Sequence, residues 1–154
     1  MNKFLLAVHV LAAIVAVGPV TVAASMFPPA ARRALADPVD TRATAVLDTL
    51  RRICRVYAGL GIAVPVFGLA TASSLGVLGD AWLIVSMALT ALAAGVLGLL
   101  ILPRQEALAS SCSADGTADL AATRRLGMYT GLFNLLWATV TVLMIVRPGS
   151  TTGV

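Results

Sequence analysis

The chain has 154 residues, of which 59% are hydrophobic and only 12% are charged. Soluble domains average about 25% charged residues, and a small domain has too much surface to hide such an apolar excess in one core. The composition excludes an ordinary soluble domain and predicts lipid as the solvent for much of the chain. The net charge of +4 lies next to the apolar runs, so it indicates contact with lipid headgroups and not nucleic-acid binding.

Four stretches contain no Asp, Glu, Lys or Arg, namely residues 4–27, 56–79, 81–103 and 126–146. Each is long enough to cross the membrane, because about 20 helical residues span the hydrocarbon core. Backbone groups in lipid must be satisfied within the segment, which favours helices. We predict an all-α membrane protein, a single domain over residues 1–154. Its four transmembrane helices are expected at about residues 4–27, 53–76, 81–102 and 126–146, with cytoplasmic connections at 28–52 and 103–125.

The basic residues are unequally distributed along the chain. Nine arginines lie in or beside the two long connections, and only Lys3 and Arg147 lie elsewhere. The positive-inside rule therefore predicts cytoplasmic connections and both termini outside. A cleavable signal peptide is the alternative interpretation of the start of the chain. However, the apolar run continues through Phe27, and cleavage would place the arginine-rich connection outside, so we expect an uncleaved first helix.

The same unit occurs twice along the chain: a helix, a long connection and a returning helix. The returning helices begin with similar residues at 51–60 and 124–132, and one gap aligns an Arg pair, a Tyr, a Gly and a Leu. Arg and Tyr are favoured at cytoplasmic interfaces, so convergence is the alternative. We predict two duplicated helical hairpins in a parallel repeat, with Tyr57 and Tyr129 at equal depth.

Small residues are expected to pack the helices, because the hydrophobic effect does not drive helices together in lipid. Gly127 and Gly131 form a GxxxG motif in the fourth helix, and Ala91 and Gly95 lie on the third. Asn134 is expected near the bilayer midplane, where an interhelical hydrogen bond would contribute about 0.6 kcal/mol.

The connections and the second helix carry further signals. Apolar residues recur at helical spacing from Asp40 to Tyr57, so the second helix is expected to extend into the cytoplasm or bend onto the lipid surface. Pro65 leaves one backbone carbonyl unpaired and is expected to kink this helix. A serine-rich turn is expected before the fourth helix, with Asp115 or Thr117 as its cap.

His9 is the only histidine, and we count it about 8 Å below the outer end of the first helix. Counting along antiparallel neighbours places a possible polar layer at this depth: Thr71, Ser86, Met87, Thr141 and Met144. One interpretation is a metal or haem ligand, with Met87 and Met144 as neighbours, because imidazole and thioether suit soft metals. The alternative is a hydrogen bond from the ring to Ser86 or Thr141. We expect the second, since soft-metal sites need several ligands, and we assign no cofactor.

Two short signatures carry a resemblance to known proteins. The first helix reads Leu-Ala-Val-His-Val-Leu-Ala-Ala at residues 6–13 with Gly18-Pro19 after it, and the last ends Met-Ile-Val-Arg-Pro-Gly at residues 144–149. The chain resembles a bacterial family of predicted four-helix integral membrane proteins, a domain of unknown function. It is less closely similar to copper-resistance D-type membrane domains, which would imply copper or haem for His9. With arginine in large excess over lysine, the resemblance implies a bacterial cytoplasmic membrane.

The residues also limit the classes of function. The four uncharged segments hold no carboxylate or amine for a proton relay, and no Ser/His/Asp set, paired carboxylates or phosphate loop occurs. We expect a protein that is not an enzyme and that packs in the lipid bilayer within a larger assembly of partner subunits or as a homo-oligomer. The alternatives are a metal- or haem-handling protein that uses His9, and an oligomeric pore lined by Ser and Thr.

Overall fold

The computed structural model describes residues 2–37, 39–114 and 120–149, and all regular structure in these ranges is helical. The elements in chain order are α1 (Asn2–Ala36), α2 (Thr41–Leu60), α3 (Ala63–Leu75), α4 (Ala81–Gly95), the π-helical η1 (Val96–Ile101), α5 (Leu102–Ala114) and α6 (Leu120–Val146). Grouped as continuous units, they form four helices that are long and apolar enough to cross a membrane. The prediction of an all-α chain with four such helices is confirmed for the described residues.

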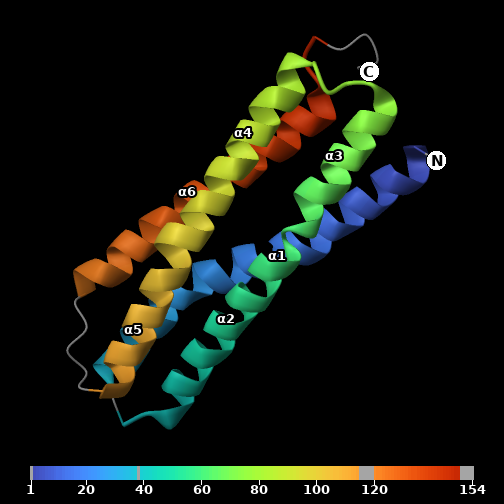
Figure 1. The fold of residues 1–154 in the computed structure, drawn as a ribbon. Coiled ribbons are helices and arrows are strands. Elements are labelled where there is room, and N and C mark those ends of the chain that lie inside the picture. The colour runs from blue at the N-terminus through green and yellow to red at the C-terminus, as the bar shows by residue number, and fades with distance from the viewer. Residues whose placement is uncertain (1, 38, 115–119, 150–154) are drawn as a thin grey trace.

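The four units form two antiparallel hairpins that lie side by side (Figure 1). α1 packs along α2 and α3, and α4 packs along α6, while contacts of α1 with α6 and of α2 with α5 join the hairpins. The N-terminal end of α1 and the C-terminal end of α6 lie at the same end of the bundle. The end of α1 and the start of α2 lie at the other end, where most arginines are found.

The first connection is largely helical. Within the predicted connection 28–52, α1 continues to Ala36 and α2 begins at Thr41. Ala31 and Ala34 of the added α1 turns are buried, as is Leu47 of α2. Alanine-rich segments have high helix propensity, and these faces pack against each other. The expected extension of the second helix beyond its uncharged run is therefore confirmed.

The second connection is also largely helical. The predicted span 103–125 contains α5 up to Ala114 and the first turns of α6 from Leu120. The uncharged runs mark only the part of a helix that suits lipid, and a helix continues as long as its propensity and packing allow. The predicted caps Asp115 and Thr117 lie outside the described residues.

Two prolines coincide with interruptions of α-helical geometry. Pro65 has no N–H for the carbonyl of Gly61, which instead accepts from the Val64 N–H at 3.1 Å. The α-helix is interrupted at residues 61–62, between α2 and α3, one turn before Pro65, where the kink was predicted. Pro103 lies two residues after the end of η1. Proline has no backbone N–H to donate, and the wider π-helical turn comes just before this position.

The core is concentrated in the half of the bundle that holds the hairpin connections. Its largest fully buried side chains include Phe27, Leu47, Ile101, Leu126 and Phe133. A smaller cluster at the opposite end contains Ala72, Trp82 and Leu83, with Met144 packed against it. In the most apolar 18-residue stretch of each long helix, only 11% to 22% is buried within the chain. The chain therefore leaves most of its apolar surface to lipid or to other proteins.

Candidate functional site

His9 of α1 lies against α3. Its Nδ1 is 3.0 Å from the backbone oxygen of Val64, and a Cβ added at Gly68 would be only 2.9 Å from its Cε1. The glycine therefore provides the space for the imidazole. Because a carbonyl oxygen only accepts, Nδ1 is the donor in this contact. The predicted bond to Ser86 or Thr141 is wrong, since the ring bonds a backbone group of α3.

The polar layer predicted around His9 has hydroxyl groups that form hydrogen bonds within their own helices. Its three hydroxyl groups each donate to a carbonyl of their own helix: Thr71 to Phe67, Ser86 to Trp82 and Thr141 to Trp137. Met144 packs in the small cluster beside Trp82, and the side chain of Met87 is exposed on α4. In the described ranges no three His, Cys, Asp or Glu side chains gather as metal ligands would.

Asn134 of α6 forms the interhelical hydrogen bond that was predicted for it. Its Nδ2 donates to the Ser25 hydroxyl of α1 across 3.1 Å. Ser25 lies six residues before the end of the uncharged run in the first helix, and Asn134 lies eight residues after the start of the uncharged run in the fourth. The Oδ1 of Asn134 and the indole Nε1 of Trp137, one turn away, are buried without a hydrogen-bond partner among the described residues.

The small residues predicted to pack the helices divide into two groups. A Cβ added at Gly127 would lie 3.9 Å from the Pro28 side chain, so this glycine faces α1. A Cβ at Gly95 or Gly131 would meet nothing within 4 Å, and Ala91 is exposed. In the single chain, no other described helix packs closely against these three positions.

An ion-pair network that the sequence interpretation missed joins the two hairpins. Glu106 of α5 pairs with both Arg51 and Arg55 of α2. Arg51 also bonds Asp48 at 3.2 Å. Glu106 is the only glutamate in the chain and lies between two arginine-rich segments, which is the sequence signal that identifies it in retrospect.

A buried polar contact lies beside this network. Gln105 is fully buried, and its Nε2 lies 3.5 Å from the Sγ of Cys54. Its Oε1 has no hydrogen-bond partner within the described part of the chain. Cys54 and Cys112 are both buried free thiols. Gln105 and Glu106 together fasten α5 to α2 through one buried and one exposed contact.

Aromatic rings mark both ends of the bundle. At the end with the termini, the Trp82 Nε1 donates to Asp80 at 3.0 Å, and the Arg147 guanidinium lies 5.6 Å from the Trp82 ring centroid. At the other end, the Arg104 guanidinium lies 4.5 Å from the Tyr129 centroid. Amphipathic rings paired with arginines are typical of the two membrane–water interfaces.

Comparison with known proteins adds no family assignment: no family model, curated protein or solved structure matches this chain. The resemblance of the first and last helices therefore stays a prediction.

Proposed function

We propose that this chain is a non-catalytic membrane protein that associates through its α1/α6 face with a helix of a second copy or of a partner subunit. We define the α1/α6 face by Gly18 and Ser25 of α1 and Gly131 and Asn134 of α6. Residues 18 and 25 are two turns apart on α1, and 131 and 134 are one turn apart on α6, so each pair shares a side of its helix.

The observation that carries the proposal is a polar pair beside open small residues. Gly18, Ser25 and Gly131 are exposed, and an added Cβ at Gly18 or Gly131 meets nothing within 4 Å. In lipid, glycine allows close approach of a second helix, and Ser and Asn add interhelical hydrogen bonds. An exposed serine paired with a half-buried asparagine is unfavourable against acyl chains and favourable against another helix.

The experiment compares two glycines that are equally open in the single chain. Gly131→Leu adds bulk to the α1/α6 face, and Gly95→Leu adds the same bulk to α4. The proteins are purified in mild detergent, and the assembly is measured by native mass spectrometry. We expect Gly131→Leu to weaken association at least about tenfold and Gly95→Leu to leave it unchanged. Loss of association only in Gly95→Leu would assign the interface to α4 and contradict the proposal.

We also propose that the two hairpins are duplicated units of a parallel repeat, with both termini outside a bacterial cytoplasmic membrane. In support, two of the aligned pairs have the same burial: Tyr57 and Tyr129 are half-buried, while Gly59 and Gly131 are exposed. Spin labels on Tyr57→Cys and Tyr129→Cys should report the same depth in the bilayer. Clearly different depths would contradict the repeat.

A second candidate function, metal or haem handling through His9, is favoured by one observation. Nδ1 bonds the Val64 carbonyl, and a histidine ligand typically anchors one nitrogen in this way while the other binds the metal. Purified wild type from copper- and haem-replete cells is compared with His9→Ala for bound metal and for a haem spectrum. Equal metal and haem contents in the two proteins would contradict this candidate.

A further inference from the structure

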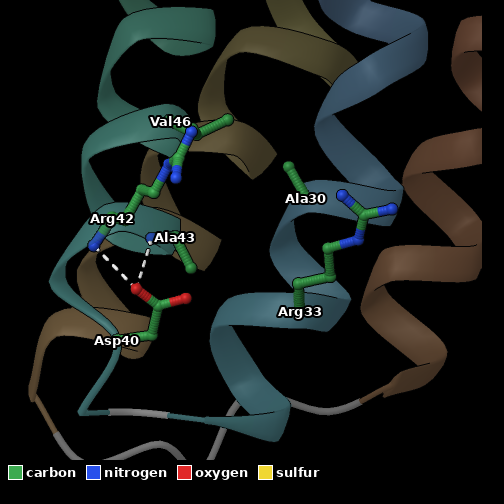
Figure 2. A pocket seen from close by; sticks show the side chains of 6 residues that line it. All are labelled: Ala30, Arg33, Asp40, Arg42, Ala43 and Val46. Carbon is green, nitrogen blue, oxygen red and sulfur yellow. Dashed lines mark hydrogen bonds between the residues drawn. The ribbon is translucent and has the colours of Figure 1, made fainter.

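A hollow of about 170 Å³ lies between the last turns of α1 and the first turns of α2 (Figure 2). Both helices of the first hairpin supply its lining residues: Ala30, Arg33, Asp40, Arg42, Ala43 and Val46. The volume is several times the roughly 30 Å³ share of one water molecule in the liquid. It is below the roughly 300 Å³ at which pockets for drug-sized ligands begin. The hollow therefore has the size for a small solute.

Two unpaired cations flank the hollow. Figure 2 shows Arg33 and Arg42 on its two sides, one from each helix. Among the described residues, neither guanidinium forms an ion pair, whereas Arg51 pairs with two carboxylates. Both guanidinium groups therefore keep their donors for a ligand.

Asp40 adds a carboxylate that has one oxygen in use and one free. Its Oδ1 accepts the backbone N–H of Arg42 at 2.8 Å and of Ala43 at 3.3 Å, and so caps α2. The other oxygen, Oδ2, accepts no hydrogen bond from the described residues. Figure 2 shows this second oxygen on the side that faces α1. A ligand in the hollow thus meets two guanidinium groups and one carboxylate oxygen.

The surroundings of the hollow suit a ligand that arrives from water. On α2, four charged residues lie between Val46 and the uncharged run that begins at Val56, a separation of about 15 Å along the helix. The three charged lining residues are all exposed. Charged side chains are costly in hydrocarbon, so we expect the ligand to be a water-soluble molecule at the arginine-rich end of the bundle.

We propose that this hollow binds a small zwitterion, namely a free α-amino acid with a short apolar side chain. Its carboxylate accepts hydrogen bonds from Arg33 and Arg42, because guanidinium groups suit planar carboxylates. Its ammonium group donates to Oδ2 of Asp40, and its side chain contacts Ala43 and Val46. A plain anion would lie beside the Asp40 carboxylate without a counter-charge for it, and a plain cation would lie beside two guanidinium groups. A zwitterion matches all three charged groups.

The first test compares three ligands that share a branched apolar end. Valine carries both charged groups, isovalerate lacks the ammonium group, and isobutylamine lacks the carboxylate. Each is titrated against full-length protein in neutral detergent and followed by the NMR signals of the ligand. We expect valine to have a dissociation constant below about 10 mM and at least about tenfold below those of the other two. Equal affinity for valine and either analogue, or no binding of valine in this range, would overturn the proposal.

The second test changes the ligand preference with one substitution. Asp40→Asn removes the charge and keeps a cap for α2, because asparagine and aspartate cap helices about equally well. Valine should then bind at least about tenfold more weakly, while isovalerate should bind as well as before or more tightly. An equal change for the two ligands would overturn the role of Asp40 in binding the ammonium group.

The third test compares two double variants that remove the same charge from the same end of the bundle. Arg33→Gln/Arg42→Gln should weaken valine binding at least about tenfold. Arg52→Gln/Arg125→Gln removes two other exposed arginines and should change it less than about twofold. Thermal unfolding of each variant verifies that the bundle is intact. Equal weakening in the two variants would overturn the proposal, because it indicates diffuse attraction only.

A last arm distinguishes a free amino acid from a lipid headgroup with the same chemistry. Phosphatidylserine carries the same ammonium and carboxylate groups on one carbon of its headgroup. Added to the detergent micelles, it should leave valine binding unchanged. Displacement of valine by phosphatidylserine would overturn the assignment to a free amino acid.

Discussion

The side-chain amide of Asn134 donates a hydrogen bond to the hydroxyl of Ser25 across 3.1 Å and so joins the last helix to the first, 109 positions apart. The Ser25 hydroxyl donates in turn to the Thr21 carbonyl at 2.7 Å. This short chain of hydrogen bonds fixes how α6 lies against α1. Because Ser25 is exposed, the pair also forms the polar part of the α1/α6 face.

Removal of this pair should reveal a coupling between its two members. In a double-mutant cycle with Ser25→Ala and Asn134→Ala, we expect a coupling energy of about 0.6 kcal/mol, the average for interhelical polar pairs in membranes. The free energy of unfolding is measured in mixed micelles. Thr139→Ala is the control, since this hydroxyl donates to the Leu135 carbonyl of its own helix. A second cycle combines Ser25→Ala with Thr139→Ala. A coupling energy in this cycle as large as that between Ser25 and Asn134 would contradict the hydrogen bond assigned to Ser25 and Asn134.

The contact of His9 with α3 predicts opposite effects at two glycines. Gly68→Ala should give a less stable protein than Gly59→Ala, because the new Cβ would displace the imidazole ring from its contact with α3. Gly59→Ala should be neutral or stabilising by up to about 1 kcal/mol, since its Cβ meets nothing and alanine favours the helix. Denaturation in detergent measures both. A Gly68→Ala protein as stable as Gly59→Ala would show that His9 does not pack at this site.

Much of the fold was predictable from the sequence, because the absence of charge over four long runs is a direct requirement of lipid. Asn134 was also predictable as an interhelical donor, since a lone amide in lipid needs a partner. Its partner Ser25 was not, because hydropathy does not tell which helices are neighbours. The error at His9 has the same cause: equal depth was assigned to all helices, but this end of α1 packs on α3, while α4 packs on α6.

The extension of α2 was predicted from the apolar spacing after Asp40, but the length of α1 was not. Hydropathy follows the thickness of the bilayer, whereas the extra turns of α1 depend on the packing of Ala31 and Ala34.

The network around Glu106 should stabilise the contact between the hairpins. Glu106→Gln should lower the free energy of unfolding by about 0.5–1 kcal/mol, a modest value because its carboxylate is 44% exposed. Asp48→Asn is the control. It removes only the 3.2 Å contact within α2 and should cost less. High salt should reduce the difference, which chemical denaturation at two ionic strengths can measure. A larger effect of Asp48→Asn would contradict the role of Glu106.

The arginine distribution predicts which end of the bundle faces the cytoplasm. In intact cells, a cysteine introduced at Ser150 should react with a membrane-impermeant maleimide, and one at the exposed Ala45 should react only after the cells are opened. The two natural cysteines are buried, and labelling of the unmodified protein gives the background signal. The reverse pattern would place the arginine-rich end outside.

The association through the α1/α6 face is tested most directly by photo-crosslinking in native membranes. A photoreactive amino acid is placed at Gly131 or at Gly95, two positions with no neighbour within 4 Å of an added Cβ in the single chain. Irradiation should convert the Gly131 protein to a larger protein adduct, with twice the mass if the neighbour is a second copy and another defined mass if it is a partner subunit. The Gly95 protein should stay at the mass of one chain. A protein adduct at Gly95 with none at Gly131, or none at either position, would contradict the account.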